Sequence, residues 1–499
     1  MSRKKTTENP ITTDLNRTGA DAKLLRNTAV FTVGKFVSKL LVLFMTRLYT
    51  ACLTTEEYGQ ADLITAAANL LIPLACLGIG EGIVRCVAGE TTDFVRRECY
   101  FTAGLLVLLA GSAGLGLLSP LIALIPMFRE TAWLIVVYVL VSNLHSIASQ
   151  YLYACGKTGL FAGQGILNTL LTILLNILFL PVLHFGVVGY VSSVIIADGL
   201  TTVFLVVYTR LWNDVRRMPL SYFRPFIREM LGFSLMMIPT TICWWITSVS
   251  DRYMVSAMHS EAENGLYTVA YKIPTLLTLA TIVFDSAWKL SVAAEKDEDA
   301  CTAFYTKVWR HYLTLSFVGG AVLILACRPI SWLLVSPDFR ASWVFVPVLT
   351  VATVFCSLDT FLGSVYFTKK KPIWSMITAI CAASLNIALN WLLIPRMGAM
   401  GAALATLASY LIAFILRIAT VRKLIPFDRR LGASVLNLTL LCLLTVAVTA
   451  TDGQISFLPA GAAWAAGSVL CAAIIIINLR PLVSLVRDLT AALLHRGRE

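Results

Sequence analysis

The sequence contains little charge. Charged residues make up 14% of its 499 residues, compared with about 25% in soluble globular proteins. Hydrophobic residues make up 58%, and the mean hydropathy is +0.79. Apolar runs of about 20 residues, the length that crosses a bilayer, recur from residue 28 to residue 479. The composition therefore predicts an all-α polytopic membrane protein and excludes a hidden soluble domain.

Closely spaced cysteines are also missing. The twelve cysteines are scattered singly, mostly within the apolar runs, and no pair has the CxxC spacing of a metal site. We interpret them as small apolar packing residues. The sequence predicts neither a metal site nor a cofactor.

Fourteen membrane spans are predicted from the apolar runs. Their expected ranges are 28–50, 60–84, 101–126, 131–154, 158–182, 186–209, 229–250, 265–288, 309–330, 341–366, 372–394, 398–421, 431–450 and 458–479. Residues 1–27 are polar and too poor in apolar side chains to fold alone, which predicts a disordered cytoplasmic tail. Residues 480–499 have apolar side chains at helical spacing and four arginines, which predicts an amphipathic cytoplasmic tail.

Lysine and arginine are scarce on one side of the predicted membrane. With the N-terminus inside, the inner segments hold 31 of the 40 Lys and Arg residues, and the outer turns hold four: Arg129, Arg328, Arg340 and Arg396. The positive-inside rule therefore predicts that both termini are cytoplasmic. The net charge of +12 is interpreted as a result of this topology and of contact with anionic membrane lipids, rather than as a nucleic-acid surface.

An internal repeat relates the two halves of the predicted spans. "NILFLPVLHFGVVG", which starts at Asn176, is echoed by "NWLLIPRMGAMG", which starts at Asn390, an offset of 214 that also relates Pro181 to Pro395. The turns "LTTEEYG" and "HSEAENG", which end at Gly59 and Gly265, can also be matched, because Arg47 lies twelve residues before Gly59 and Arg252 thirteen before Gly265. Six spans separate corresponding helices, so the two halves have the same orientation in the membrane.

The repeat predicts two parallel six-helix lobes around a central cavity, an arrangement suited to alternating access. We expect an N-lobe at 28–210 (spans 1–6), a cytoplasmic linker at 211–228 and a C-lobe at 229–422 (spans 7–12). Spans 13 and 14, at 431–479, lie outside the repeat and are two extra C-terminal helices.

These segments resemble a known family. The stretch "NTAVFTVGKFVSKLLVLFMTRLYTACLTTEEYGQADL", the stretch "LGIGEGIVR" and the two Asn-Pro-Gly-Gly hairpins look like bacterial lipid-linked oligosaccharide flippases of the multidrug/oligosaccharidyl-lipid/polysaccharide exporter superfamily. The resemblance covers residues 27 to 425 and implies a location in the bacterial cytoplasmic membrane. It also implies that an undecaprenyl-pyrophosphate-type glycan lipid is moved to the outer leaflet for cell-surface polysaccharide assembly. A polysaccharide polymerase and glycosyltransferases are then candidate partners.

Five cations lie within the predicted spans: Lys35, Lys39, Arg47, Arg252 and Lys272. A cation in hydrocarbon costs about 2.5–3.5 kcal/mol on insertion scales. Each of these side chains is therefore expected either to reach water at the membrane surface or to have a function within the span. The functional interpretation is that they line the cavity and bind the pyrophosphate through charge-assisted hydrogen bonds. It is favoured for Arg47 and Arg252, which occupy matching places in the two lobes. The alternatives are snorkelling, which is favoured for Lys35, and pairing with nearby acids.

Acidic residues in the spans are candidate partners of these cations or ion-coupling groups. They are Asp62, Asp198, Asp251 and Asp285. Lys272 precedes Pro274, whose ring frees a backbone carbonyl and kinks the helix; its pairing with Asp285 or Asp251 is the alternative to a place in the cavity. Glu81 and Arg85 stand at i and i+4, which fits a helix ion pair or a cytoplasmic gate.

Two other functions compete with the flippase. A drug/cation antiporter of the same superfamily would use the acids as coupling groups, but the five cations in the spans argue against it. A membrane glycosyltransferase or polysaccharide polymerase would need long outer loops with catalytic carboxylates, whereas the outer connections here are short and contain few acids. We therefore expect a transporter and not an enzyme.

Overall fold

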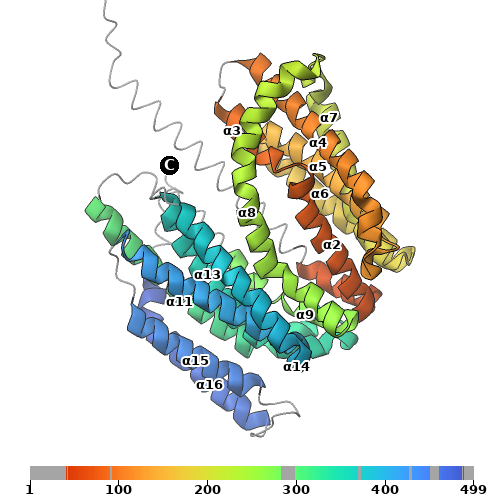
Figure 1. Cartoon of the computed structure of the whole chain (residues 1–499). Helices are drawn as coiled ribbons and strands as arrows, with labels where there is room; N and C mark the ends of the chain where they lie inside the picture. The colour runs from red at the N-terminus through yellow and green to blue at the C-terminus, as the bar shows by residue number, and fades with distance from the viewer. Residues whose placement is uncertain are drawn as a thin grey trace, which may run out of the picture.

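The structure, a computed structural model, describes residues 43–89, 93–281, 298–368, 372–425, 430–449 and 460–485, together with Leu41 and Arg487 (Figure 1). All regular secondary structure within these ranges is helical. The predicted all-α membrane fold is therefore confirmed. The predicted tail at 1–27, and all but the start of the tail at 480–499, lie outside the described residues.

The helices follow one another along the chain with short connections. Residues 43–52 are helical, and the labelled α-helices are α2 (Thr55–Ala75), α3 (Ile79–Gly89), α4 (Phe94–Ala123), α5 (Ala132–Ala154), α6 (Thr158–Ile177), α7 (Gly186–Thr209), α8 (Leu220–Met258), α9 (Glu261–Ala270), α11 (Glu298–Leu325), α12 (Cys327–Leu334), α13 (Val346–Thr368), α14 (Pro372–Val421), α15 (Leu431–Thr449) and α16 (Ala460–Ile477). Four shorter helical turns are η1 (Pro126–Phe128), η2 (Leu178–Val182), η3 (Leu211–Asp214) and η4 (Pro337–Phe345).

Among the described residues, eight helices are long and apolar enough to cross a membrane, and the number rises to eleven if each of three bent pairs counts as one span. One of the bent pairs is α2 with α3, which meet at 51° where a single span was predicted at 60–84. The predicted spans 372–394 and 398–421 both fall within α14, which contains a break at Gly398. Spans 28–50 and 265–288 lie partly outside the described residues. The count of fourteen therefore stays a prediction.

Two pairs of repeat-related residues have the same local structure. Thr54 caps α2, since its hydroxyl accepts from the Glu57 backbone N–H at 3.2 Å, and Ser260 caps α9 in the same way at 3.1 Å from the Glu263 N–H. Gly186 and Gly398, the first glycines of the two echoed hairpins, both adopt left-handed backbone angles, with φ of +54° and +57°. The echo thus reflects a backbone conformation that glycine adopts without strain.

The helices form two groups that differ in sequence position. Helices α2–α7, here called the N-terminal bundle, pack on one another, and α9, α11, α13 and α14, here called the C-terminal bundle, form the second group (Figure 1). The hairpin α15–α16 packs on α11. Large apolar side chains remain exposed on the outside of the N-terminal bundle, including Leu117 (82% exposed) on α4, as expected for a surface in lipid.

Helix α8 belongs to both groups. It bends by 48° between Leu220–Met236 and Thr241–Met258. Phe223 and Met230 in its first part are buried in one cluster with Ile79 and Ile83 of α3, whereas its second part contacts α14 and α9. The sequence placed the start of the C-lobe at 229, but the packing divides α8 at its bend, because its first part buries its apolar side chains against the N-terminal bundle.

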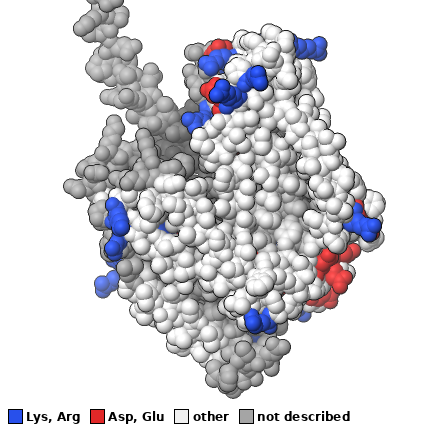
Figure 2. All heavy atoms as spheres, viewed as in Figure 1, with Lys and Arg blue, Asp and Glu red and all other residues white. Residues whose placement is uncertain are grey.

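Charge lies near the edges of the molecule in the view of Figure 2. Basic residues are visible around the upper end, at the left and right edges and near the bottom, an acidic group lies at the lower right, and a broad uncharged surface lies between them. Such a surface is suited to contact with hydrocarbon, since an exposed charge there would be costly.

Candidate functional site

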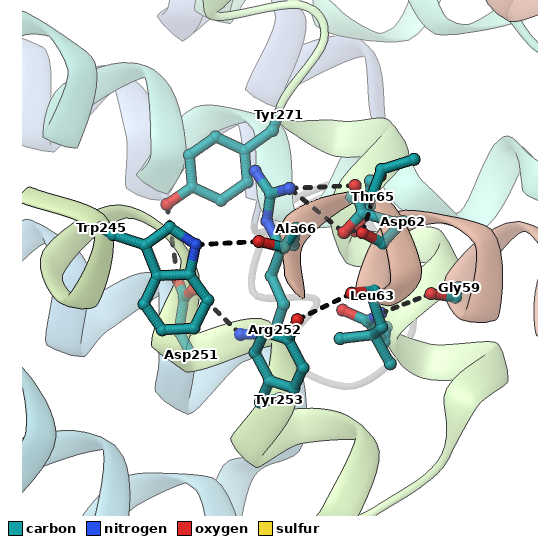
Figure 3. Close-up of polar contacts among 12 residues, drawn as sticks. Gly59, Asp62, Leu63, Thr65, Ala66, Trp245, Asp251, Arg252, Tyr253 and Tyr271 are labelled. Atoms are coloured by element: carbon teal, nitrogen blue, oxygen red, sulfur yellow. Dashed lines mark hydrogen bonds and ion pairs between the residues drawn. The ribbon is translucent and has the colours of Figure 1, made fainter. Parts of the chain in front are cut away.

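The candidate site lies where α2 of the N-terminal bundle meets α8 and α9 (Figure 3). We call this contact the α2–α8–α9 interface. It contains Asp62, Asp251, Arg252 and Lys272 of the predicted site residues. Lys35, Lys39 and Asp285 lie outside the described residues, so their predicted roles stay predictions.

Gly59 and Gly265 bring the backbones of α2 and α9 into contact. A Cβ added at Gly59 would lie 2.2 Å from the Glu261 carbonyl oxygen, and one at Gly265 would lie 2.0 Å from that of Thr55. No real Cβ tolerates such distances, so both positions require glycine, as in other close helix crossings in membranes. The Asn264 side-chain amide also donates to the Gly59 carbonyl at 3.2 Å. The two glycines that the repeat relates therefore meet one another.

An ion pair joins the bundles next to this crossing. Arg252 Nη1 lies 3.0 Å from Asp62 Oδ1 and 3.1 Å from Asp62 Oδ2. Thr268 Oγ1 donates to the same Oδ2 at 3.0 Å. The guanidinium lies over the ring of Tyr271, 5.2 Å from its centroid (Figure 3). Both partners are largely buried, and removing one member of a buried pair costs about 3–5 kcal/mol.

Two hydrogen bonds to backbone carbonyls extend the interface along α2. Trp245 Nε1 donates to the Ala66 carbonyl at 3.0 Å, and the Tyr253 hydroxyl donates to the Leu63 carbonyl at 2.7 Å (Figure 3). Together with the ion pair they fix α2 to α8 over more than one helical turn.

Asp251 does not form an ion pair with Arg252, although the sequence offered that pairing as an alternative. Its Oδ2 accepts from the Tyr267 hydroxyl at 2.7 Å and from Thr406 Oγ1 at 3.2 Å. Its Oδ1 accepts from the backbone N–H of Arg252 at 2.9 Å. The carboxylate is therefore bound within the C-terminal side of the interface, because the Arg252 side chain extends to α2.

Lys272 lies close enough to Asp62 and Arg252 to interact with both electrostatically. Its ammonium group forms no hydrogen bond or ion pair with any residue that the structure describes. The alternative pairing with Asp251 is therefore wrong for this structure, because that carboxylate is bound by hydroxyl and backbone donors.

Arg47 lies elsewhere. It is exposed and donates to the Val335 carbonyl at the end of α12. Nearby, the Ser336 hydroxyl donates to the Thr50 carbonyl at 2.5 Å. Arg47 thus links the helical segment 43–52 to the C-terminal half of the chain, and its partners differ from those of Arg252 although the sequence placed the two at matching positions.

The remaining predicted residues lie away from the interface. Asp198 accepts from Ser142 at 2.5 Å and from the Asn168 amide at 2.7 Å, within the N-terminal bundle. Glu81 and Arg85, both described, do not pair with one another; Arg85 lies over the ring of Phe233 on α8, 4.3 Å from its centroid. The expected i,i+4 ion pair is wrong, because the guanidinium packs on α8 instead.

Several residues of the interface were not predicted. Thr268 follows Gly265 by three residues, as Asp62 follows Gly59, so the repeat contained a signal for their contact. The sequence contained no such signal for Trp245, Tyr253 and Tyr267. Trp245 and Tyr253 donate to backbone carbonyls, and Tyr267 donates to the carboxylate of Asp251.

Comparison with known proteins identifies the family of this chain and solved structures that share its fold. A family model described as "Polysaccharide biosynthesis protein" matches residues 24–286, more than half of the chain. No curated protein sequence matches the chain.

Among solved structures, the fold is similar to that of a lipid II flippase MurJ in an inward closed conformation, with a TM-score of 0.67, 14% identity and coverage of 93% of this chain and 100% of that one. It is also similar to an inward-facing multidrug resistance MATE family transporter of the MOP superfamily (TM-score 0.64, 15% identity, 78% and 95% coverage). A third similar structure is a MOP superfamily transporter from Pyrococcus furiosus (TM-score 0.52, 14% identity, 80% and 96% coverage). At these identities the likeness establishes the fold.

Proposed function

Because the chain belongs to the polysaccharide biosynthesis protein family, we propose that it is an alternating-access transporter in the bacterial cytoplasmic membrane. Its substrate is a polyprenyl-pyrophosphate-linked oligosaccharide, which it moves from the inner to the outer leaflet for cell-surface polysaccharide assembly. The family match and the fold shared with a lipid II flippase support this proposal.

The observation that carries the proposal is the position of Arg252 and Lys272 at the contact between the bundles. Cations are expensive within a membrane, and an anionic substrate gives Lys272 a partner and Arg252 a further one besides Asp62. A pyrophosphate offers several oxygens to a guanidinium and an ammonium, whose charge-assisted hydrogen bonds are about twice as strong as neutral ones. The polyprenyl chain can remain in lipid throughout.

The α2–α8–α9 interface acts as the closed outer side in this proposal. The predicted topology puts the turns before Gly59 and Gly265 outside the membrane. The glycine crossing and the Asp62–Arg252 pair hold the bundles together at that end. Substrate release to the outer leaflet then requires these contacts to open, and alternating access follows from making and breaking them.

The test is a flipping assay in proteoliposomes with a fluorescent polyprenyl-pyrophosphate-linked saccharide, whose exposure is followed with a membrane-impermeant quencher. We expect Arg252→Ala combined with Lys272→Ala to reduce the flipping rate at least about tenfold, since each charged hydrogen bond contributes about 1.5–3 kcal/mol. Arg396→Ala is the matched control, because Arg396 is exposed and bonds the Leu392 carbonyl of its own helix. Wild-type flipping by a folded double variant would contradict the proposal.

A drug/cation antiporter is the second candidate. Asp198 and Asp251 are buried carboxylates whose hydrogen bonds come from hydroxyl, amide and backbone donors, without a Lys or Arg side chain. Such groups suit ion coupling. Export of a cationic dye by the same proteoliposomes, lost in Asp251→Asn and unaffected by Arg252→Ala, would favour this function over the flippase.

A further inference from the structure

Arg252 uses only part of its guanidinium. Its Nη1 makes both bonds to Asp62, whereas its Nε is buried and has no hydrogen-bond partner among the residues that the structure describes. A guanidinium carries five N–H donors in a rigid planar fork, and buried donors in proteins are nearly always paired. The unpaired Nε therefore points to an acceptor that the described part of the chain does not supply.

Lys272 adds a second unused donor at the same place. It lies within electrostatic reach of Asp62 and Arg252 but is bonded to neither. The nearby acceptors are already occupied, since Asp62 takes Arg252 and Thr268, and Asp251 takes Tyr267 and Thr406. Among the residues that the structure describes, the interface thus has cationic donors without hydrogen-bond partners, and both of its carboxylates are already bonded.

We propose that Asp62 is a built-in competitor of the anionic substrate. Without substrate, the carboxylate of Asp62 binds Arg252 and thereby connects α2 to α8. A pyrophosphate group binds the Nε edge of Arg252 together with Lys272 and displaces Asp62. This inference rests on the proposed function, since it takes the pyrophosphate head group from there.

Two features of the geometry favour displacement by such an anion. Asp62 engages a single guanidinium nitrogen, whereas a pyrophosphate has enough oxygens to accept from several Arg252 donors and from Lys272 at once. Until the bundles separate, the displaced carboxylate keeps its hydrogen bond from Thr268 of α9, so it is not left without a donor during the exchange. The ring of Tyr271 holds the guanidinium plane in place during the exchange.

The consequence is a direct link between binding and opening. Asp62 belongs to the N-terminal bundle, whereas Arg252 and Lys272 lie on α8 and just after α9. When the pyrophosphate takes Arg252, the ion pair between the bundles is lost. A ligand shifts a conformational equilibrium when its affinities for the two states differ. Here the pyrophosphate binds the closed state more weakly than the open one, because in the closed state it must first break the Asp62–Arg252 contact.

The test measures farnesyl pyrophosphate binding to the purified full-length protein by titration calorimetry. We expect Asp62→Asn to bind it about tenfold more tightly than wild type, because the competing charge is gone. Lys272→Met should bind it about tenfold more weakly. Asp359→Asn is the matched control: Asp359 pairs with Arg417 at 3.0 Å, also largely buried, but both residues lie within the C-terminal bundle. This control should bind as wild type does.

A second measurement tests whether Asp62 holds the two bundles together or only contributes to the stability of the protein. Cysteines introduced at Glu56 and Glu261, in a chain without native cysteines, report closure of α2 on α9 through disulfide formation. Farnesyl pyrophosphate should slow this crosslinking in the otherwise wild-type chain. Asp62→Asn should slow it without ligand, and Lys272→Met should leave the ligand-free rate unchanged, because Lys272 does not bond α2.

The possible outcomes are distinct. Equal affinities of wild type and Asp62→Asn would overturn the inference and leave the proposed function standing. Absence of binding in both proteins would overturn the inference together with the pyrophosphate substrate. Tighter binding by Asp62→Asn with unchanged ligand-free crosslinking would also overturn it, since the carboxylate would then compete without holding the bundles together.

Discussion

Gly59 and Gly265 determine how closely the two bundles approach. Each faces a backbone carbonyl oxygen of the other helix, and a backbone oxygen cannot turn aside as the end of a flexible side chain can. Each glycine has only a hydrogen atom where other residues have a Cβ, and this allows α2 and α9 to approach so closely. The same close approach places Asp62 within reach of Thr268 and Arg252.

Replacing Gly59 with alanine should weaken this contact. We expect Gly59→Ala to lower stability by about 1–3 kcal/mol, as overpacking does elsewhere, measured as a lower thermal unfolding midpoint in detergent. Gly114→Ala is the control, because nothing lies within 4 Å of the added Cβ in α4 and alanine favours the helix. Equal midpoints for the two variants would show that the crossing tolerates a methyl group.

The sequence predicted the members of the candidate site better than their contacts. Asp62 was among the predicted charge partners and Arg252 among the cations, and the structure pairs them across 190 residues of chain. Which acid binds which cation depends on how the bundles dock, and hydropathy contains no information on that. The carbonyl acceptors of Trp245 and Tyr253 were out of reach for the same reason, since a backbone oxygen is present at every residue.

At the scale of helices, the N-termini of α2 and α9 face one another with two carboxylates. Burial raises the pKa of Glu261, and the neighbouring Glu56 raises it further. A raised pKa means that the closed interface binds a proton more readily than the open or unfolded chain does. Closure is therefore favoured at low pH, and this advantage is lost as pH rises through the raised pKa of Glu261.

The raised pKa of Glu261 predicts a measurable pH dependence of bundle closure. The two bundles should close more completely as pH falls through the raised pKa of Glu261, seen as a shorter distance between spin labels on η4 and α7. In Glu261→Gln the distance should no longer change over that pH range, because the side chain does not titrate. A pH response of the same size in the glutamine variant would exclude Glu261 as its source.

Hydropathy located most helices, but it did not reveal their bends. The predicted spans 101–126, 131–154, 158–182 and 186–209 overlap α4, α5, α6 and α7 closely. The predicted linker at 211–228 was identified by its charges, and those charges fix it in place: Asp214 accepts from Tyr151 at 2.9 Å, and Arg216 pairs with Glu98. The sequence predicted a linker between the lobes, and in the structure its ion pair and hydrogen bonds attach it to the N-terminal bundle.

At the scale of the whole molecule, the distribution of lysine and arginine predicts the orientation. With 31 of 40 on one side, both termini should be cytoplasmic. A green fluorescent protein fused after Glu499 should fluoresce, and alkaline phosphatase fused after Arg129 or Arg340 should be active, because it folds only outside the cytoplasm. The reverse pattern would turn the α2–α8–α9 interface into the inner gate.

The bend in α8 has a consequence for how the protein can be divided. The sequence repeat relates two halves of the chain, yet the chain does not pass from one bundle to the other in a loop. It does so within a helix, and residues 220–236 pack with the N-terminal bundle. A fragment that starts at Leu220 therefore contains a piece of the other fragment's core. A division of the chain that keeps each cluster of buried side chains intact therefore falls at the bend of α8, between Met236 and Thr241.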